Sequence, residues 1–582
     1  MGAHRPVVMG RRHAVACGHH LAAQAAYAIL EDGGNAIDAG VAAGIVLGVV
    51  HSDIVSFAGV APMIIRLADG RVTTIDGLGT WPRAATCELF QREHGGAIPE
   101  GLRRTVVPAA PAAWITALER FGTRSFADVA HAAIAAARDG FAVYPLLAQN
   151  IADNEAAYRR WASNRAVYLP DDRPPRPGEW FVQADLARTI QHMADEEAAH
   201  AARGRAAGLR AALDAFYRGD IAATICDYHA ANGGLLARAD LADYRVREEE
   251  PIIVDLGAHQ LYCCGAWCQG ISMAQAAALT APLDAAALGH NSADYVHTLA
   301  ECLKLVFADR ERYVGDPAMV DVPVDGMLDP AYLAARRELV DAERAWPEMP
   351  PAGDPRQGLA VEATAHRVHE GRRAPAPIAD PHGARSAALD TSYLAVMDAA
   401  GNVFSATPSD TSADTEVIPG TGLAVSSRGS QSRADSAHPA SVAPGKRPRL
   451  TPNPAMLLGN GAPLMAFGTP GGDVQIQAML QVLFNITRFG MDVQSAIEAP
   501  RFASYSFPSS FAPNDYHPGL LMVEEGIDEQ TMSALAARGH RAERWPPRGW
   551  KAGGVCVVMR DPETGAFHAG ADPRRAGYAL AG

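Results

Sequence analysis

The segment that most constrains this chain is TSYLAVMDAAGNVFSATPS, residues 391–409. It reads as two apolar, β-branched runs joined by a turn at residues 399–402, a pattern that predicts a buried hairpin. Residues 345–388 before it are rich in Pro, Gly, His and Arg and lack sustained periodicity, which is typical of a linker. We therefore expect a free segment that ends where a rigid strand begins, at Thr391.

A threonine at this place has a specific chemistry once the Asp390–Thr391 bond is cut. The hydroxyl of an N-terminal threonine can attack a carbonyl, while its own α-amino group, with a reference pKa of about 7.7–8.0, accepts the proton. In the uncut chain this nitrogen is an amide without basicity. The hydroxyl can, however, attack the carbonyl of Asp390 by an N-to-O acyl shift, after which water releases the ester. An Asp-Thr pair alone does not predict this reaction, so the rest of the chain must support it.

Local signals elsewhere predict a chain of mixed helices and strands. Residues 20–50 read as two helices, separated by Gly33-Gly34 and restarted by Asn35 as a cap. Other segments with clear patterns are a hairpin at 62–76, an Ala-rich helical region at 108–220, a strand pair at 251–264 and an amphipathic helix at 292–313.

Composition excludes several partners. The formal net charge is −14, whereas nucleic acids and anionic membranes require basic patches, so neither is expected as a partner. The eight cysteines lack zinc-binding spacing, and we expect no metal and no cofactor. The N-terminal residues lack the apolar stretch of a secretory signal, and no segment approaches the roughly 18 apolar residues of a membrane span. A cytoplasmic location is therefore expected.

A series of segments along the chain resembles the motifs of one protein family, in the same order. From about residue 14 to residue 578 the chain resembles the gamma-glutamyltransferase (glutathione hydrolase) family of N-terminal-nucleophile hydrolases. The segments that carry the resemblance are HHLAAQAAYAILEDGGNAIDAGVAAGIVLGVV (19–50), FGTRSFADVAHAAIAAARDGFAVYP (121–145), LADYRV (241–246), GHNSADYVHTLAECLKLVFADRERYVGDP (289–317), DTSYLAVMDAAGN (390–402), GKRPRLTPNP (445–454), FGTPGG (467–472), GMDVQSAIEAPRF (490–502) and GADPRRAGY (570–578).

The resemblance implies a fold and an active site. The fold is an α/β (α+β), four-layer αββα sandwich built from two chains of one precursor, a large subunit 1–390 and a small catalytic subunit 391–582. The cleavage site is then Asp390–Thr391, with Thr391 as the nucleophile and Ser409 as a supporting hydroxyl. Gly471 and Gly472 would be oxyanion-hole donors, because backbone N–H groups in a Gly-rich turn converge on a developing negative oxygen. The two fragments are expected to stay associated, and the processed heterodimer to form a homodimer.

The residues that would hold a glutamyl α-carboxylate depart from the family pattern. An arginine follows the first hairpin in the family, but Leu78 stands at that place in DGLGTWP (76–82). Two serines that contact the same carboxylate correspond to Leu450 and Thr451. A leucine cannot pair with a carboxylate, and leaving one unpaired in a buried site is costly.

The residues that would hold the α-amino group differ as well. The family has an asparagine, a glutamine and an aspartate, whereas this chain has Thr411, Arg428 and Gln431. Gln431 offers no charge for an ammonium, and Arg428 would repel one. With Thr451, these three side chains are the candidate substrate-binding residues, unless Arg428 lies on a surface loop. They favour an acyl group that carries a carboxylate elsewhere and no amine. Tyr393, which replaces the usual histidine, is compatible with activity.

These observations are compatible with three alternative functions. The first is an autoprocessing amidohydrolase that acts on a small amide or N-acyl substrate through an acyl-enzyme at Thr391. The second is γ-glutamyl hydrolysis or transfer, as on glutathione, through a modified pocket. The third is an unprocessed, non-catalytic binding protein, against which the intact Thr391, Ser409 and glycine pair argue.

Overall fold

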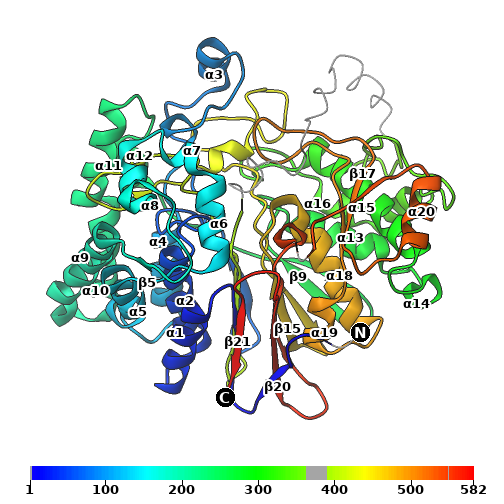
Figure 1. Cartoon of the computed structure of the whole chain (residues 1–582), viewed down its shortest axis with the longest axis horizontal. Coiled ribbons are helices and arrows are strands. Elements are labelled where there is room, and N and C mark those ends of the chain that lie inside the picture. Colours follow the sequence, from blue (N-terminus) through cyan, green and yellow to red (C-terminus); the bar gives the residue numbers. More distant parts are fainter. Residues whose placement is uncertain (1–2, 362–389, 548) are drawn as a thin grey trace.

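The computed structural model describes residues 3–361, 390–547 and 549–582. Two antiparallel sheets of seven strands each pack face to face, with helices on both outer sides (Figure 1). This arrangement is the predicted αββα sandwich. The first sheet has the order β1 (Val8–Gly10), β20 (Phe567–Ala571), β19 (Cys556–Arg560), β15 (Ala462–Gly468), β14 (Ala455–Gly459), β9 (His259–Cys263) and β8 (Ile252–Asp255). The second has the order β21 (Tyr578–Ala581), β2 (Ala14–Cys17), β10 (Leu394–Met397), β11 (Val403–Ala406), β3 (Met63–Arg66), β4 (Val72–Ile75) and β7 (Glu248–Glu249).

Successive side chains along a strand point alternately to the outer helices and to the space between the two sheets. In β10, Leu394 and Val396 pack with the helices of one outer side, whereas Ala395 and Met397 pack between the two sheets. This follows from the strand period of two, which sends successive side chains to opposite faces. Both faces of the hairpin are therefore buried, as its apolar runs predicted.

The helices form the two outer layers (Figure 1). On the outer side of the second sheet, α1 (His20–Glu31) and α2 (Ala36–Val50) pack on the strands, and beyond them lie α4 (Ala110–Phe121), α5 (Phe126–Asp139), α9 (Ala184–His200), α10 (Arg205–Tyr217) and α11 (Asp220–Ala231). Against the first sheet lie α13 (Gly270–Thr280), α15 (Ala293–Tyr313), α17 (Pro330–Arg337), α18 (Gln475–Thr487) and α19 (Val493–Glu498).

Shorter elements surround this frame. Among them are α3 (Cys87–His94), α6 (Pro145–Asp153), α7 (Glu155–Tyr158), α8 (Ala162–Tyr168), α12 (Arg238–Asp243), α14 (Ala285–Leu288), α16 (Val324–Leu328) and α20 (Glu529–Ala537). Small sheets pair β5 (Phe141–Ala142) with β6 (Trp180–Phe181), pair β12 (Val417–Ile418) with β13 (Leu423–Ala424), and join β16 (Phe502–Ser504), β17 (Leu520–Val523) and β18 (Arg541–Arg544).

The predicted cap at Asn35, the hairpin at 62–76 and the strand pair at 251–264 are confirmed, and the structure adds a cap at Ser292. Asn35 caps α2 through a capping box with Asp38, and the Ser292 side chain caps α15. The hairpins expected at 62–76 and 251–264 are β3–β4 and β8–β9. Of the predicted linker, residues 345–361 lie in no helix or named strand, and residues 362–389 lie outside the described part of the chain.

One boundary differs from the prediction. Strand β10 begins at Leu394 rather than at Thr391, and Thr391 pairs with Ser409 in an isolated bridge of the same register. The cause is Pro408 on the opposite strand. Its carbonyl accepts from Ser392 N at 3.0 Å, but proline has no N–H to return, so the ladder is interrupted between the bridge and the strand.

Both sheets combine strands from before and after residue 391. In the second sheet β10 and β11 lie between β2 and β3, and in the first sheet β14 pairs with β9. A cut at Asp390–Thr391 would therefore leave two fragments joined by several strand ladders. Over the described residues, no helix is both long and apolar enough to cross a bilayer.

Candidate active site

Thr391 lies three residues before β10, buried beside Ser409. Its hydroxyl is 2.7 Å from that of Ser409, and the side chains are 1% and 0% exposed. The backbone of Ser409 is tied to the segment that precedes β3, because its N–H donates to Val60 O at 3.0 Å. Gly59 makes this approach feasible, since a Cβ at this residue would lie 2.4 Å from the carbonyl oxygen of Ser409. The two hydroxyls are thus held in contact by the sheet.

The carbonyl oxygen of Asp390 receives two side-chain hydrogen bonds. Ser409 Oγ donates to it at 3.0 Å and Arg428 Nη2 at 2.9 Å. Arg428 Nη2 also donates to Ser409 Oγ. A hydroxyl has one donor and two acceptor positions. Because Ser409 donates to Asp390 and accepts from Arg428, its remaining lone pair faces Thr391.

Arg428 is fully buried rather than on a surface loop. It begins the short 3₁₀ turn Arg428–Gln431, and its guanidinium lies 5.4 Å from the ring centre of Phe511. Burial lowers the pKa of Arg428 from its ordinary value, and Asp410, whose carboxylate is 4.0 Å from Nε, opposes that shift. A guanidinium remains protonated in such a site. The carbonyl of Asp390 is therefore polarised by a cation away from water, where electrostatic interactions are strong.

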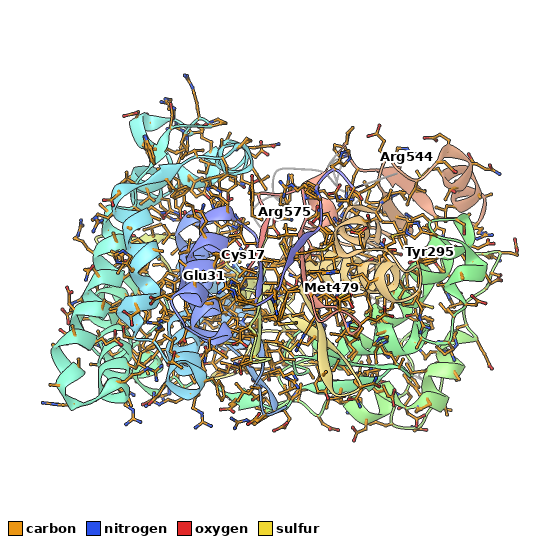
Figure 2. The ribbon with its side chains drawn as sticks, turned by 90° about the horizontal axis from the view of Figure 1, so that it is seen from below. Cys17, Glu31, Tyr295, Met479, Arg544 and Arg575 are labelled. Carbon is orange, nitrogen blue, oxygen red and sulfur yellow. The ribbon has the colours of Figure 1, made fainter. Side chains whose placement is uncertain are left out.

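The carboxylate of Asp390 has a separate partner. Arg575, which lies between the two helical layers in Figure 2, forms an ion pair with it. Burial raises the pKa of Asp390 above its ordinary value, and Arg575 opposes this shift. In the uncut chain Asp390 is thus held at its carbonyl by Arg428 and Ser409, and at its side chain by Arg575.

Asp53 and His51 lie in the electrostatic range of the same ion pair. Burial raises the pKa of Asp53 to about 7, and burial and Arg575 lower the pKa of His51 to about 3. The Asn150 amide donates to one oxygen of Asp53 at 2.9 Å, and Ser392 Oγ lies 3.1 Å from His51 Nδ1. Among the described residues, Asp53 Oδ1 and His51 Nε2 have no hydrogen-bond partner. Both groups are therefore expected to be neutral at pH 6.

The raised pKa of Asp53 predicts a pH-dependent stability. Asp53 ionises near pH 4 when unfolded but near pH 7 when folded, so the folded chain binds more protons between these values. Stability should therefore fall as the pH rises from about 4 to 7. Asp53→Asn, made in a Thr391→Ala chain that stays uncut, should remove this loss, by at most about 4 kcal/mol above pH 8. Its melting temperature should exceed that of Thr391→Ala clearly at pH 8.5 but little at pH 5. If the two proteins show the same change of melting temperature with pH, the raised pKa of Asp53 would be contradicted.

Gly471 and Gly472 lie near the site without contacting Asp390. Both have positive φ, at 124° and 56°. A Cβ at Gly472 would lie 3.2 Å from the Phe511 ring, and that ring also faces Arg428. The side chains of Arg428 and Ser409, rather than the glycine N–H groups, contact the Asp390 carbonyl in the uncut chain. The oxyanion role of the glycine pair remains a prediction for the processed enzyme.

The other predicted binding residues are also buried. Gln431 Nε2 donates to Thr451 Oγ1 at 2.8 Å, and the Thr411 hydroxyl has no partner among the described residues. Leu78 and Leu450 pack in the apolar cluster between the sheets, each 0% exposed. These two positions therefore offer no polar contact to a carboxylate, as their replacement by leucine predicted.

One group of side chains in the described residues has metal-ligand spacing, far in sequence from Thr391. His297, Glu301 and His540 place one ligand atom each within 4.8 Å of the others. Their atoms already have partners, since His297 Nδ1 and His540 Nε2 are 2.9 Å apart and Lys304 pairs with Glu301 at 2.7 Å. A cation would have to displace the Lys304 ammonium, so this cluster is best described as a buried polar network.

The four-layer sandwich, with a hydroxyl residue just before a central strand, defines the class of N-terminal-nucleophile hydrolases. The family model described as Gamma-glutamyltranspeptidase matches residues 22–582, and the chain belongs to this family. It is thus an enzyme of the hydrolase and acyltransferase type.

Known relatives include two kinds of enzyme. "Acylase ACY 1 proenzyme" of Pseudomonas sp. (strain SE83) is 34% identical over 95% of this chain and 91% of its own length. "Glutathione hydrolase proenzyme" of Bacillus subtilis (strain 168) is 30% identical over 99% and 92%. The crystal structure of cephalosporin acylase from Bacillus halodurans superposes with a TM-score of 0.85 at 27% identity, covering 100% of this chain and 98% of that one. The family resemblance and the fold expected from the sequence are both confirmed.

Three residues of the site were not identified from the sequence. Arg575 lies within the quoted motif GADPRRAGY, where two consecutive arginines were the available signal. Asp53 and His51 follow helix α2 and carry no motif, because their significance comes from burial and from residues more than 300 positions away. Arg428 was identified, but its contact with the Asp390 carbonyl was not.

Proposed function

We propose that the chain cuts itself before Thr391 and then hydrolyses a small amide or N-acyl substrate through an acyl-enzyme at Thr391. The observation that carries the proposal is the hydroxyl pair of Thr391 and Ser409, 2.7 Å apart, beside an Asp390 carbonyl that Arg428 and Ser409 polarise. Nucleophile, proton acceptor and carbonyl activation are then present at one peptide bond.

The reaction at Asp390 proceeds in two steps. Thr391 Oγ1 bonds to the carbonyl carbon of Asp390 while its proton moves through the Ser409 hydroxyl, which relays it toward the amide nitrogen, and Arg428 stabilises the negative oxygen. The C–N bond then breaks, the nitrogen takes up the proton, and Asp390 becomes an ester on Thr391. Water hydrolyses this ester, which releases the carboxylate of Asp390 and regenerates the hydroxyl. Thr391 now carries a free α-amino group. The pKa of an unperturbed chain terminus is about 7.7–8.0, so part of this amine is unprotonated near neutral pH.

The processed enzyme repeats this chemistry on an external amide. The Thr391 amine accepts the hydroxyl proton, the substrate acyl group transfers to Oγ1, and the protonated leaving group departs as an amine. Gly471 and Gly472 are the proposed oxyanion donors for this reaction. Water then releases the acid.

The proposed substrate is not a classical γ-glutamyl compound. Leu78 and Leu450 are apolar and buried, and Gln431 is neutral and bonded to Thr451. The similarity to relatives named as acylases also supports a substrate other than a γ-glutamyl compound. The acyl group proposed is one that carries a carboxylate but no α-amine.

A matched pair of substrates tests this specificity. Glutaryl-p-nitroanilide and γ-glutamyl-p-nitroanilide differ only in the α-ammonium. Leaving that ammonium without a charged partner should lower kcat/KM for the γ-glutamyl compound by about 10- to 100-fold. Release of p-nitroaniline by processed enzyme measures both values. Faster turnover of the γ-glutamyl compound would favour the alternative.

That alternative is γ-glutamyl hydrolysis or transfer through a modified pocket. The similarity to glutathione hydrolases at 30% identity over almost the whole chain supports it. The two fragments are proposed to remain together, because both sheets mix their strands. A homodimer of this unit and a cytoplasmic location remain predictions, the latter supported by eight buried cysteines without disulfides.

A further inference from the structure

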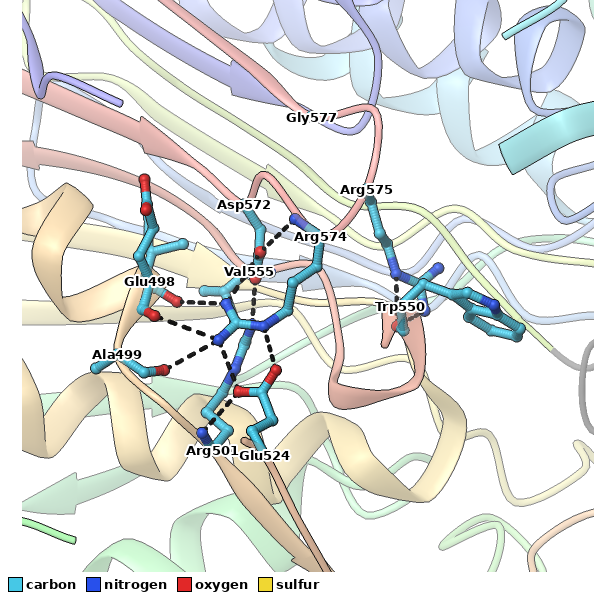
Figure 3. A network of polar contacts seen from close by, with 12 residues as sticks. Glu498, Ala499, Arg501, Glu524, Trp550, Val555, Asp572, Arg574, Arg575 and Gly577 are labelled. Carbon is cyan, nitrogen blue, oxygen red and sulfur yellow. Dashed lines mark hydrogen bonds and ion pairs between the residues drawn. The ribbon is translucent and has the colours of Figure 1, made fainter. Parts of the chain in front are cut away.

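Arg575 is fixed by contacts that do not involve Asp390. It follows Arg574 in the connection between β20 and β21, and the two side chains diverge (Figure 3). Arg574 turns to Glu524 and to backbone carbonyls, whereas Arg575 donates from Nε and Nη2 to Trp550 O at 3.2 and 3.0 Å. Its guanidinium lies 5.1 Å from the Trp550 ring centre, and a Cβ at Gly554 would come within 2.4 Å of its Cδ. Trp550 therefore fixes Arg575, in the space that Gly554 leaves, through contacts that do not involve Asp390.

The remaining nitrogen, Nη1, pairs with the Asp390 carboxylate. The side chains of Arg575 and Asp390 are only 6% and 1% exposed. Once Asp390 is released as a chain end, Arg575 loses this partner, and a buried cation without an anion is costly. The processed site thus contains a fixed, buried guanidinium that requires a carboxylate.

The self-cleavage ester shows where that carboxylate would belong. The ester of Asp390 on Thr391 is the same chemical species as an acyl-enzyme formed from a substrate. In it, two carbons, Cα and Cβ, separate the reacting carbonyl from the carboxylate that Arg575 holds. The Asp390 residue therefore occupies the acyl site as a built-in first substrate.

We propose that Arg575 is the carboxylate-binding residue of the acyl site and selects acyl groups with a carboxylate two carbons beyond the reacting carbonyl, as in N-succinyl amides. This rests on the proposed function. Asp53, the nearby carboxyl, is protonated below about pH 7 and so does not repel such an acyl group at pH 6.

Succinyl-p-nitroanilide and its neutral amide analogue, succinamoyl-p-nitroanilide, test the proposal at pH 6. Processed wild-type enzyme should favour the charged compound by about 10- to 100-fold in kcat/KM. Arg575→Gln should bring this ratio close to one. The surface variant Arg83→Gln, whose ion pair with Asp243 is exposed, should keep the wild-type ratio. A ratio that survives in Arg575→Gln, or a wild-type preference for the neutral compound, would overturn the proposal.

Arg575→Gln is also expected to slow self-cleavage, because Arg575 positions Asp390. Asp390→Ala should slow it by a similar factor, and the double variant should be no slower than either single variant. The double variant then supplies processed enzyme that lacks Arg575, with processed Asp390→Ala as its reference. If the double variant stays uncut while Asp390→Ala is cut, Arg575 does not act on self-cleavage through the Asp390 carboxylate.

Binding of succinate separates this proposal from the proposed function. Succinate should raise the melting temperature of processed Asp390→Ala enzyme but not that of the double variant, even if neither anilide is hydrolysed. Equal shifts in both proteins, or no shift in either, would exclude Arg575 as the receptor. If neither anilide is hydrolysed but succinate still gives the Arg575-dependent shift, the proposed amidase activity would be contradicted and the role of Arg575 would not.

Discussion

Thr391→Ala is expected to abolish self-cleavage completely. The wild-type chain should give two bands on a denaturing gel, about 41 and about 20 kDa in proportion to 390 and 192 of the 582 residues of a 61.4 kDa chain. The smaller fragment should begin Thr-Ser-Tyr. The variant should remain a single band at full length, because alanine has no hydroxyl to attack the Asp390 carbonyl.

Two further variants make this result specific. Thr407→Ala removes a hydroxyl that is equally buried in the same hairpin, but whose oxygen has no hydrogen-bond partner among the described residues. It should be cut like the wild type. Thr391→Ser retains a hydroxyl and should still be cut. Fragments with the same N-terminus from Thr391→Ala would show that another group performs the cleavage.

Arg428→Met should slow self-cleavage by about 10²–10³-fold, the usual cost of losing one donor to a developing oxyanion. Methionine keeps an unbranched chain of similar length but removes the hydrogen bonds to the Asp390 carbonyl and to Ser409. A cell-free translation reaction, which makes the chain uncut, allows the rate to be followed on denaturing gels.

Arg433→Met is the matched control. Arg433 is also buried and follows in the same segment, but it bonds to the carbonyl of Ser509 and to Glu311 rather than to Asp390. It should process at a rate close to that of the wild type if it folds, which its melting temperature shows. Arg428→Lys, which retains a cation, should be intermediate. Processing of Arg428→Met at the wild-type rate would leave Ser409 as the sole activating contact.

Local interactions explain what could be predicted of the fold. The cap at Asn35 and the hairpin turn at 399–402 depend on neighbours a few residues away, so their positions follow from the sequence. The uninterrupted apolar run in β10 likewise predicts that both faces are buried. The start of β10 was misplaced because the interruption depends on Pro408, which acts across the ladder rather than along the strand.

The sequence by itself predicted which bond is cut and which residue attacks it, and it showed that the family's charged glutamyl contacts are missing at Leu78 and Gln431. Only the tertiary structure decided how the bond is held. Arg428 and Arg575 reach Asp390 from 38 and 185 residues away. The pKa of Asp53 likewise depends on burial between packed elements. Such contacts and shifts arise from the packing of distant segments and the exclusion of water, which no local pattern specifies.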